Sequence, residues 1–215
     1  MPKVIQPENP APSPTKSRSK WAFYAVLGVC IAPTIAAFAA YYGMDWQDRS
    51  ETTNYGELIK AQPAAVLPSA TTLDGKSFDL SSLGKNWTYV HADSGVCAQA
   101  CADRLFATRQ IRAMTGRERE RVERLFIVTD DAPVAPALIA AHPDLTIIRA
   151  PAASLGFLPV AAGQSLASTT WLMDPLNRVM MRYADMGNIK NTDPKRVHKD
   201  LSKLLYASKS WQGKT

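Results

Sequence analysis

An uninterrupted apolar run near the N-terminus most limits what this chain can fold into. The segment WAFYAVLGVCIAPTIAAFAAYY, Trp21–Tyr42, holds 22 residues without a charged side chain. A helix rises about 1.5 Å per residue, so this segment can cross the roughly 30 Å hydrocarbon core of a bilayer. Aromatic residues, which favour the membrane–water interface, stand at both of its ends. We therefore expect one transmembrane helix over residues 21–42, kinked at Pro33.

Charges on the two sides of this run predict its orientation. Four basic residues and one acidic residue precede it, whereas three acidic residues and one basic residue follow within nine positions. Because basic segments tend to stay in the cytoplasm, the N-terminus should remain there while the rest of the chain crosses. Ala37–Ala39 resembles a cleavage site, but the apolar run is longer than a secretory signal needs. We expect an uncleaved, single-pass anchor that contacts membrane lipid through residues 21–42.

The rest of the chain divides into a tail, a stem and one domain. Residues 1–20 are rich in Pro, Lys and Ser and should form a disordered cytoplasmic tail. Residues 43–66 should form a polar stem, and residues 67–213 are sufficient for one compact core.

The positive charge of the chain does not indicate a nucleic-acid-binding protein. The formal net charge is +6 and the pI is about 9.3, and half of that excess lies in the N-terminal tail. The other basic residues are not clustered with interleaved aromatic ones, so we expect no nucleic-acid partner. The run GRERERVER, Gly116–Arg124, alternates in charge and should be a solvated helix face.

Residues 67–213 show the alternation of strand and helix patterns that is typical of an α/β fold. Buried parallel strands are short continuous apolar runs, and helices have apolar residues recurring every three or four positions. On these patterns we expect a hairpin at 71–80, a strand at 86–93, a helix at 100–116, a strand at 124–131, a short helix at 132–143, a strand at 145–150, a pair of strands at 168–183 and a helix at 193–208. This order predicts a mixed sheet, parallel with an antiparallel edge, and flanking helices. A cysteine pair between the first core strand and the next helix is where a thioredoxin-like fold carries its chemistry, so we expect an α/β fold of that kind.

Two of the three cysteines lie four positions apart in the segment SGVCAQAC, Ser94–Cys101. In a regular helix the Cβ atoms of such a pair are about 5–6 Å apart, slightly too far for a disulfide. We therefore place Cys97 in the loop and Cys101 in the first helical turn, where the positive helix end favours a thiolate. Such a pair can exchange disulfides, bind a soft metal or form an inert structural disulfide. Cys30 lies in the apolar run and should only pack there.

Several motifs together resemble the Sco/SenC family. Besides the anchor, they are LDGKSFDLSSLGKNWTYV, the CxxxC pair before a long helix, FIVTDD and WLMDP, within about residues 67–207. The resemblance looks closest to a divergent proteobacterial branch. It implies a thioredoxin-like protein of cytochrome c oxidase assembly that handles copper, anchored in the bacterial inner membrane with its C-terminal domain in the periplasm. The partner it implies is a cytochrome c oxidase subunit or a copper-handling protein, and Cys97 and Cys101 correspond to the family's cysteines.

The sequence departs from the family pattern at two places. The family has proline beside and within the pair, typically CPxxCP, whereas this chain has CAQACA. The family also uses a histidine shortly before the strand that matches WLMDP, but Gly163–Thr170 contains none and Leu166 is nearest by alignment. His91, six residues before Cys97, is a weak candidate for a third ligand. Copper is therefore a candidate ligand of Cys97 and Cys101 without the histidine that would complete its site.

Other polar and thioether side chains near these elements have simpler interpretations. Asp93 ends the strand before Cys97 and is a candidate proton acceptor. Asp130 and Asp131 end a predicted parallel strand and should cap the next helix. We assign exposed or packing positions to the remaining candidates, which are His142, His198, Met180 and Met181.

These observations predict a membrane-anchored factor in oxidase biogenesis that acts by thiol–disulfide exchange, by Cu(I) delivery or by both. If the chain is an enzyme, it is a thiol–disulfide oxidoreductase. The alternative is a noncatalytic assembly scaffold that keeps the fold as a docking surface. All of these functions use the anchor and the fold, so the chemistry of Cys97 and Cys101 distinguishes them.

Overall fold

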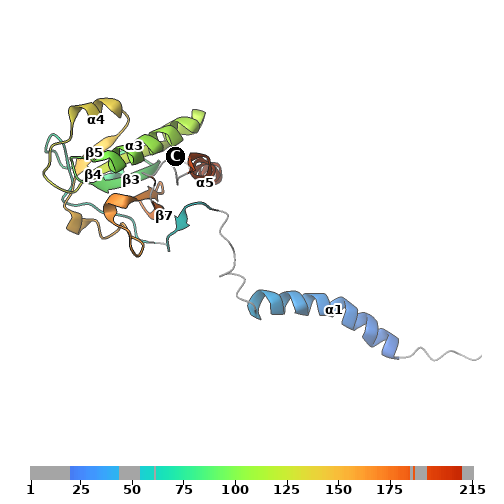
Figure 1. The fold of residues 1–215 in the computed structure, drawn as a ribbon. Helices are drawn as coiled ribbons and strands as arrows, with labels where there is room; N and C mark the ends of the chain where they lie inside the picture. Colours follow the sequence, from blue (N-terminus) through green and yellow to red (C-terminus); the bar gives the residue numbers. More distant parts are fainter. Residues whose placement is uncertain (1–19, 44–53, 61, 185, 187–192, 210–215) are drawn as a thin grey trace, which may run out of the picture. The chain divides into compact units, whose positions relative to one another are not determined.

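Residues 20–43, 54–60, 62–184, 186 and 193–209 are described by the structure, a computed structural model of the chain. They belong to two units, Met1–Glu51 and Thr52–Thr215. The first contains helix α1 (Lys20–Gly43), which includes Pro33 (Figure 1). Within it, Lys20–Ala40 is long and apolar enough to cross a membrane, with a mean hydropathy of 2.0. The predicted apolar helix is confirmed, whereas the predicted tail lies outside the described residues apart from Lys20.

The described residues of the second unit form a seven-stranded mixed sheet. Its strands are β1 (Glu57–Leu58), β2 (Thr71–Thr72), β3 (Trp87–Asp93), β4 (Val122–Val128), β5 (Thr146–Arg149), β6 (Thr169–Met173) and β7 (Val179–Ala184). They lie in the order β1-β7-β6-β3-β4-β5-β2. Strands β3, β4 and β5 are parallel, and every other neighbouring pair is antiparallel. The mixed sheet predicted from the sequence is confirmed.

Helices connect and cover these strands. The α-helices are α3 (Gln99–Met114), α4 (Pro136–Ala141) and α5 (Pro194–Ala207), and the 3-10 helices are η1 (Leu80–Leu83), η2 (Gly116–Arg121), η3 (Ala152–Ser154) and η4 (Leu166–Ser168). The predicted start of α5 is correct, because the Asp193 side chain accepts a hydrogen bond from the Lys195 amide and Pro194 occupies the first helical turn.

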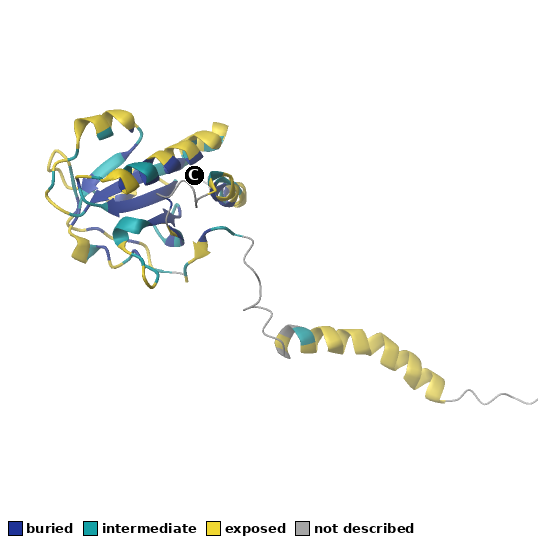
Figure 2. Cartoon of the chain, in the orientation of Figure 1, coloured by how far each residue is buried: buried dark blue, intermediate teal, exposed yellow. Residues whose placement is uncertain are grey.

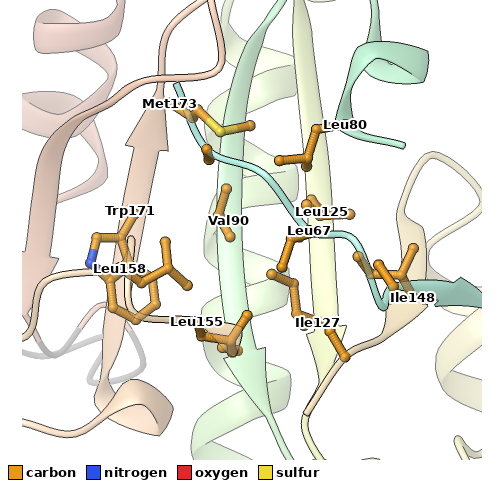
Figure 3. Packing of buried hydrophobic residues seen from close by; sticks show 14 of the residues in the cluster. Leu67, Leu80, Val90, Leu125, Ile127, Ile148, Leu155, Leu158, Trp171 and Met173 are labelled. Atoms are coloured by element: carbon orange, nitrogen blue, oxygen red, sulfur yellow. The ribbon is translucent and has the colours of Figure 1, made fainter. Parts of the chain in front are cut away.

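The two faces of the sheet are covered differently. Helices α3 and α5 pack on one face, where Trp87, Tyr89 and Leu172 point from the strands. Mostly irregular chain covers the other face, where Leu67, Leu155 and Leu158 pack on the alternate strand residues, among them Val90 and Leu125 (Figure 3). This alternation follows from the two-residue period of a strand. The central strands are therefore buried on both faces, while the outer sides of α3 and α5 remain exposed (Figure 2).

Three local predictions are wrong, and one of them fails because a charged residue occupies a buried position. The segment predicted as a solvated helix face divides into the exposed η2 and the start of β4, in which Arg124 is fully buried. Asp130 and Asp131 do not cap α4, which begins after Ala135 without a side-chain cap. The predicted hairpin at 71–80 is reduced to one bridge between Thr71 and Ser77, and β2 pairs instead with β5.

An edge strand comes from the range predicted as a stem. Strand β1 pairs with β7, and the amides of Tyr55 and Gly56 donate to the buried carboxylate of Asp200 on α5, at 2.8 and 3.0 Å. A Cβ atom at Gly56 would lie 2.5 Å from side-chain atoms of Met181 and Tyr183, so glycine is needed here. We call these contacts the β1–α5 clasp.

Candidate redox site

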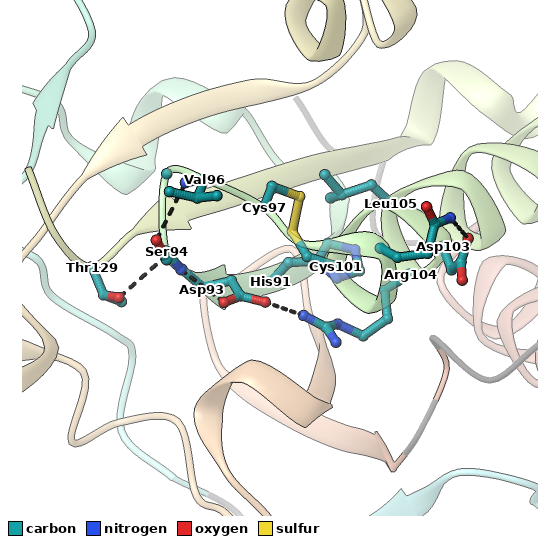
Figure 4. Close-up of a disulfide and its surroundings, with 12 residues drawn as sticks. His91, Asp93, Ser94, Val96, Cys97, Cys101, Asp103, Arg104, Leu105 and Thr129 are labelled. Atoms are coloured by element: carbon teal, nitrogen blue, oxygen red, sulfur yellow. Dashed lines mark hydrogen bonds and ion pairs between the residues drawn. A yellow bond between two sulfur atoms is a disulfide. The ribbon is translucent and has the colours of Figure 1, made fainter. Parts of the chain in front are cut away.

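The cysteine pair lies between the end of β3 and the beginning of α3. Cys97 precedes Ala98, the N-cap residue, and Cys101 lies in the first turn of the helix. The two residues are joined in a disulfide with a Cα–Cα distance of 5.1 Å (Figure 4). The predicted placement of the two cysteines is confirmed. The positive end of α3 favours a thiolate at this place once the bond is reduced.

The two cysteines differ in exposure. Cys101 is only 2% exposed and packs in a cluster with Leu105, Phe126 and Val128. Cys97 is half-buried at the edge of the same cluster, next to the strongly exposed Val96. A partner sulfur can therefore reach Cys97 more easily than Cys101.

The loop before Cys97 is held in place by its contacts with the loop after β4. The Gly95 amide donates to the Asp130 carboxylate at 2.9 Å. This hydrogen bond is the main reason why the pKa of Asp130 is below its ordinary value. A Cβ atom at Gly95 would lie 2.2 Å from the carbonyl oxygen of Ala132, so the two loops can pack only with glycine at this position. Arg149 donates to the carbonyls of Asp130 and Ala132, at 2.6 and 2.9 Å, and thereby fixes the second loop.

Cys97 itself has a strained backbone. Its φ angle is +44°, in the left-handed region that residues other than glycine rarely adopt. The fixed Gly95 on one side and the disulfide to α3 on the other hold Cys97 in this conformation. The sequence predicts the cysteine loop, but the partners of Gly95 come from a segment 35 residues later.

Asp93 is engaged at the beginning of this loop. One carboxylate oxygen accepts from the Ser94 amide at 2.8 Å, and the other pairs with the guanidinium of Arg104 (Figure 4). Arg104 belongs to α3 and is only 4% exposed. Through these contacts Asp93 joins β3, the loop and α3, and its candidate role as a proton acceptor stays a prediction.

His91 lies inside the domain, between the sheet and α3. Its ring nitrogens contact the hydroxyl groups of Thr108, at 3.1 Å, and Thr170, at 3.3 Å. Burial, followed by the charges of Arg124 and Arg104, lowers the pKa of His91 well below its ordinary value. The imidazole is therefore neutral and fully used in hydrogen bonds, which favours a packing role over that of a metal ligand.

Sulfur atoms are the metal donors that the site offers. Within the part of the chain that the structure describes, no three His, Cys, Asp or Glu side chains are grouped so that they could hold a metal ion. Leu166 is half-buried on η4, which packs against both β3 and α3. The position that the family resemblance assigns to a histidine is thus close to the elements that carry the cysteine pair, but it holds an apolar side chain.

Comparisons with known proteins agree with this architecture. A family model described as "Transmembrane-like, thioredoxin-like, C-terminal domain" matches residues 87–208. Among solved structures, apo Sco1 from Thermus thermophilus is 19% identical and has a TM-score of 0.54, over 72% of this chain and 99% of that one. Yeast Sco1 with copper bound is 16% identical, with a TM-score of 0.52, over 68% of this chain and 95% of that one.

A plant structure is similar to the same extent. Arabidopsis thaliana ScoI with copper bound is 17% identical and has a TM-score of 0.50, over 69% of this chain and 99% of that one. A comparison with curated protein sequences returned no match. At these identities the structures establish a common fold, which confirms the predicted Sco-like thioredoxin fold. Because the family model matches more than half of the residues of this chain, the chain belongs to the family of transmembrane-like, thioredoxin-like C-terminal domains.

Proposed function

We propose that this protein is a membrane-anchored thiol–disulfide exchange factor in the biogenesis of cytochrome c oxidase. Its domain lies on the periplasmic side of the bacterial inner membrane, and its partner is an oxidase subunit or a copper-handling protein with a cysteine pair. The observation that carries the proposal is the disulfide between half-buried Cys97 and buried Cys101 at the start of α3. The Sco-like fold and the motifs shared with the Sco/SenC family support the link to the oxidase.

The exchange proceeds in two balanced steps. In the reduced protein the Cys97 thiolate attacks one sulfur of a partner disulfide, a mixed disulfide forms, and the other partner sulfur leaves as a thiolate. The Cys101 thiolate then attacks Cys97, the Cys97–Cys101 bond forms, and the second partner sulfur leaves. Two electrons pass from this chain to the partner, whose cysteines are then able to bind copper.

Cu(I) is a second candidate substrate of the same pair. Two thiolates on one side of a helix start suit Cu(I), since it is a soft ion that accepts sulfur donors. The disulfide must be reduced before any metal binds. With His91 engaged in the core and Leu166 in place of the family's histidine, the pair would carry Cu(I) as cargo through its two sulfurs alone.

Intact bacterial cells that express the full chain with Cys30→Ser provide the test of both location and redox state. We expect the pair to be isolated as a disulfide. After mild external reduction, a membrane-impermeant maleimide should label Cys97 and Cys101 without lysis. The same chain in lysed cells is the control for reagent access. Labelling only after lysis would contradict the periplasmic location, and a pair that stays unlabelled after reduction even in lysed cells would contradict the exchange function.

Copper binding should depend on residue 166 rather than on His91. Leu166→His should increase Cu(II) binding by the reduced full-length protein at least about tenfold, because imidazole supplies the nitrogen donor that Cu(II) prefers. His91→Ala should leave the Cu(II) affinity within about twofold of that of the unmodified protein, since the side chain already uses both nitrogens in the core. Equilibrium titration against a chelator measures both effects. Firm Cu(II) binding by the unmodified protein that His91→Ala abolishes would show that His91 is a ligand.

A noncatalytic scaffold remains the alternative function. It would require neither cysteine, so oxidase assembly in cells should survive the double change Cys97→Ala/Cys101→Ala. Loss of assembly with normal amounts of the variant protein would support the exchange or copper function.

A further inference from the structure

The net positive charge of the folded domain is concentrated on its last helix. Residues 54–192 contain 14 Lys and Arg against 13 Asp and Glu, whereas residues 193–209 contain five against two. Of these two acidic residues, Asp193 caps the helix and Asp200 is buried in the β1–α5 clasp. The outer side of α5 is therefore basic, on a domain that is otherwise close to neutral.

The basic residues of α5 form one stripe. Lys195, Lys199 and Lys203 recur every four positions, so they lie above one another on the exposed side of the helix. The opposite side of α5 is buried in the core through Val197, Leu201 and Leu205. Tyr206, 76% exposed, continues the stripe at the C-terminal end, where the Lys209 ammonium lies 5.7 Å from its ring centroid and 3.8 Å from the Glu118 carboxylate. We call the exposed residues Lys195, Lys199, Lys203, Tyr206 and Lys209 the basic stripe.

The chain from the apolar helix enters the domain beside α5. Tyr55 and Gly56 are bonded to Asp200, and the guanidinium of Arg196 lies 4.7 Å from the centre of the Tyr55 ring. Eleven residues separate the end of α1 at Gly43 from Tyr55. Such a segment spans at most about 40 Å when fully extended. Helix α5 can therefore reach the surface of any membrane that α1 crosses.

We propose that the basic stripe of α5 binds anionic lipid headgroups at the surface of the membrane in which α1 is anchored. Lysines held near a membrane are attracted to anionic headgroups, and a tyrosine ring favours the interface between headgroups and acyl chains. The chain that leads from α1 reaches the domain at Tyr55, beside α5, which favours the membrane rather than an acidic protein as the partner of the stripe. This binding sets which side of the domain faces the lipid, and it does not depend on the chemistry of the cysteine pair.

Lysine accessibility in the full-length protein tests this proposal. The protein is inserted in nanodiscs of phosphatidylcholine, with or without about one third phosphatidylglycerol, and exposed lysines are acetylated for a short time and quantified by mass spectrometry. We expect Lys195 and Lys199 to react about fivefold more slowly in the anionic discs at low salt, because headgroup contacts shield them. Lys76 and Lys85, exposed elsewhere on the domain, are internal controls that should not change. The protection should disappear near 1 M salt, where charge interactions are screened.

Two double variants distinguish binding by the basic stripe from a nonspecific effect of lysine charge. Lys195→Gln/Lys199→Gln should remove most of the protection of Lys203 and Lys209, whereas Lys76→Gln/Lys85→Gln should leave it intact. Equal labelling in the two kinds of disc would overturn the proposal, as would equal protection of Lys76 and Lys85. Protection of the stripe by added polyglutamate but not by anionic discs would assign this face to an acidic protein instead. The cysteine chemistry should be unchanged in both variants, so this test fails or succeeds independently of the proposed function.

Discussion

Reduced Cys97 should react with oxidised glutathione at least about tenfold faster than reduced Cys101 when each is the only cysteine of the pair. The compared proteins are full-length chains with Cys30→Ser and either Cys101→Ser or Cys97→Ser. Cys97 lies half-buried before the first turn of α3, whereas Cys101 is 2% exposed inside an apolar cluster. Accessibility therefore makes Cys97 the attacking sulfur and leaves Cys101 to resolve the mixed disulfide. The formation of the glutathione adduct is followed by mass spectrometry.

Unfolding supplies the control for this comparison. In strong denaturant both cysteines are solvated and far from any helix end, so their rates should agree within about twofold. Equal rates in the folded proteins, or a faster Cys101, would reverse the assigned order of attack. A slow reaction of both folded proteins would instead favour a structural disulfide.

Removal of the Asp144 carboxylate should destabilise the domain by about 2–3 kcal/mol. Asp144 lies 3.3 Å from the guanidinium of Arg124, which is fully buried, and 3.4 Å from that of Arg112. Asp144→Ala leaves the Arg124 charge without its counter-ion. This loss costs about 3–5 kcal/mol for a fully buried pair, and less here because the Asp144 side chain is 23% exposed. Burial lowers the pKa of Arg124 to about 10, so the side chain is still charged at neutral pH.

Denaturant unfolding measures this effect, and Glu120→Ala is the matched control. Glu120 pairs with Arg119 at the surface, where both side chains are more than half exposed, so its removal should change stability by less than about 0.5 kcal/mol. Addition of Arg124→Leu to Asp144→Ala should recover part of the loss, because the unpaired charge is then gone. If Arg124→Leu lowers the stability further, the packing of Arg124 rather than its charge stabilises the domain.

The same pair predicts a dependence on pH. Burial by itself would raise the pKa of Asp144, but the charge and hydrogen bonds of Arg124, with Arg112, hold that pKa below its ordinary value of 3.8. The folded state thus binds the proton less readily than the unfolded one. The stability that Asp144 contributes is fully present above its ordinary pKa and is lost as the pH falls through the lower, folded value. The difference in the free energy of unfolding between the parent protein and Asp144→Ala should therefore decrease over that acidic range.

The sequence predicts those parts of the molecule that depend on neighbours along the chain. Strand β3, helix α3 and the cysteine placement follow from apolar periodicity and from the local geometry of a helix start. Strand β1 has two exposed residues, and its pairing with β7 joins positions 125 residues apart, such as Glu57 and Arg182. A pattern of local hydrophobicity contains no information on such a pairing.

Charged residues whose partners lie elsewhere in the sequence are the second reason why the structure differs from the predictions. Arg124 carries a charge, yet its side chain is fully buried, where it contacts the Leu105 carbonyl, the Thr108 hydroxyl and Asp144. Asp130 likewise was expected at a helix start but accepts from Gly95 instead. In both cases a group that is distant in sequence forms a hydrogen bond with the charged side chain. Composition can indicate that such residues are hydrophilic, but only the fold shows which donors meet them.

The β1–α5 clasp also constrains when the domain can become complete during synthesis. The chain is made from its N-terminus, so β1 exists long before its partners in β7 and before Asp200, which lies 144 residues after Gly56. Until α5 has been made, the amides of Tyr55 and Gly56 have only water to bond. Contacts of such long sequence separation form late and slow the folding of a domain. The contacts of Tyr55 and Gly56 with Asp200 are therefore among the last that the domain can form, and a chain interrupted before α5 lacks them even after β7 has been made.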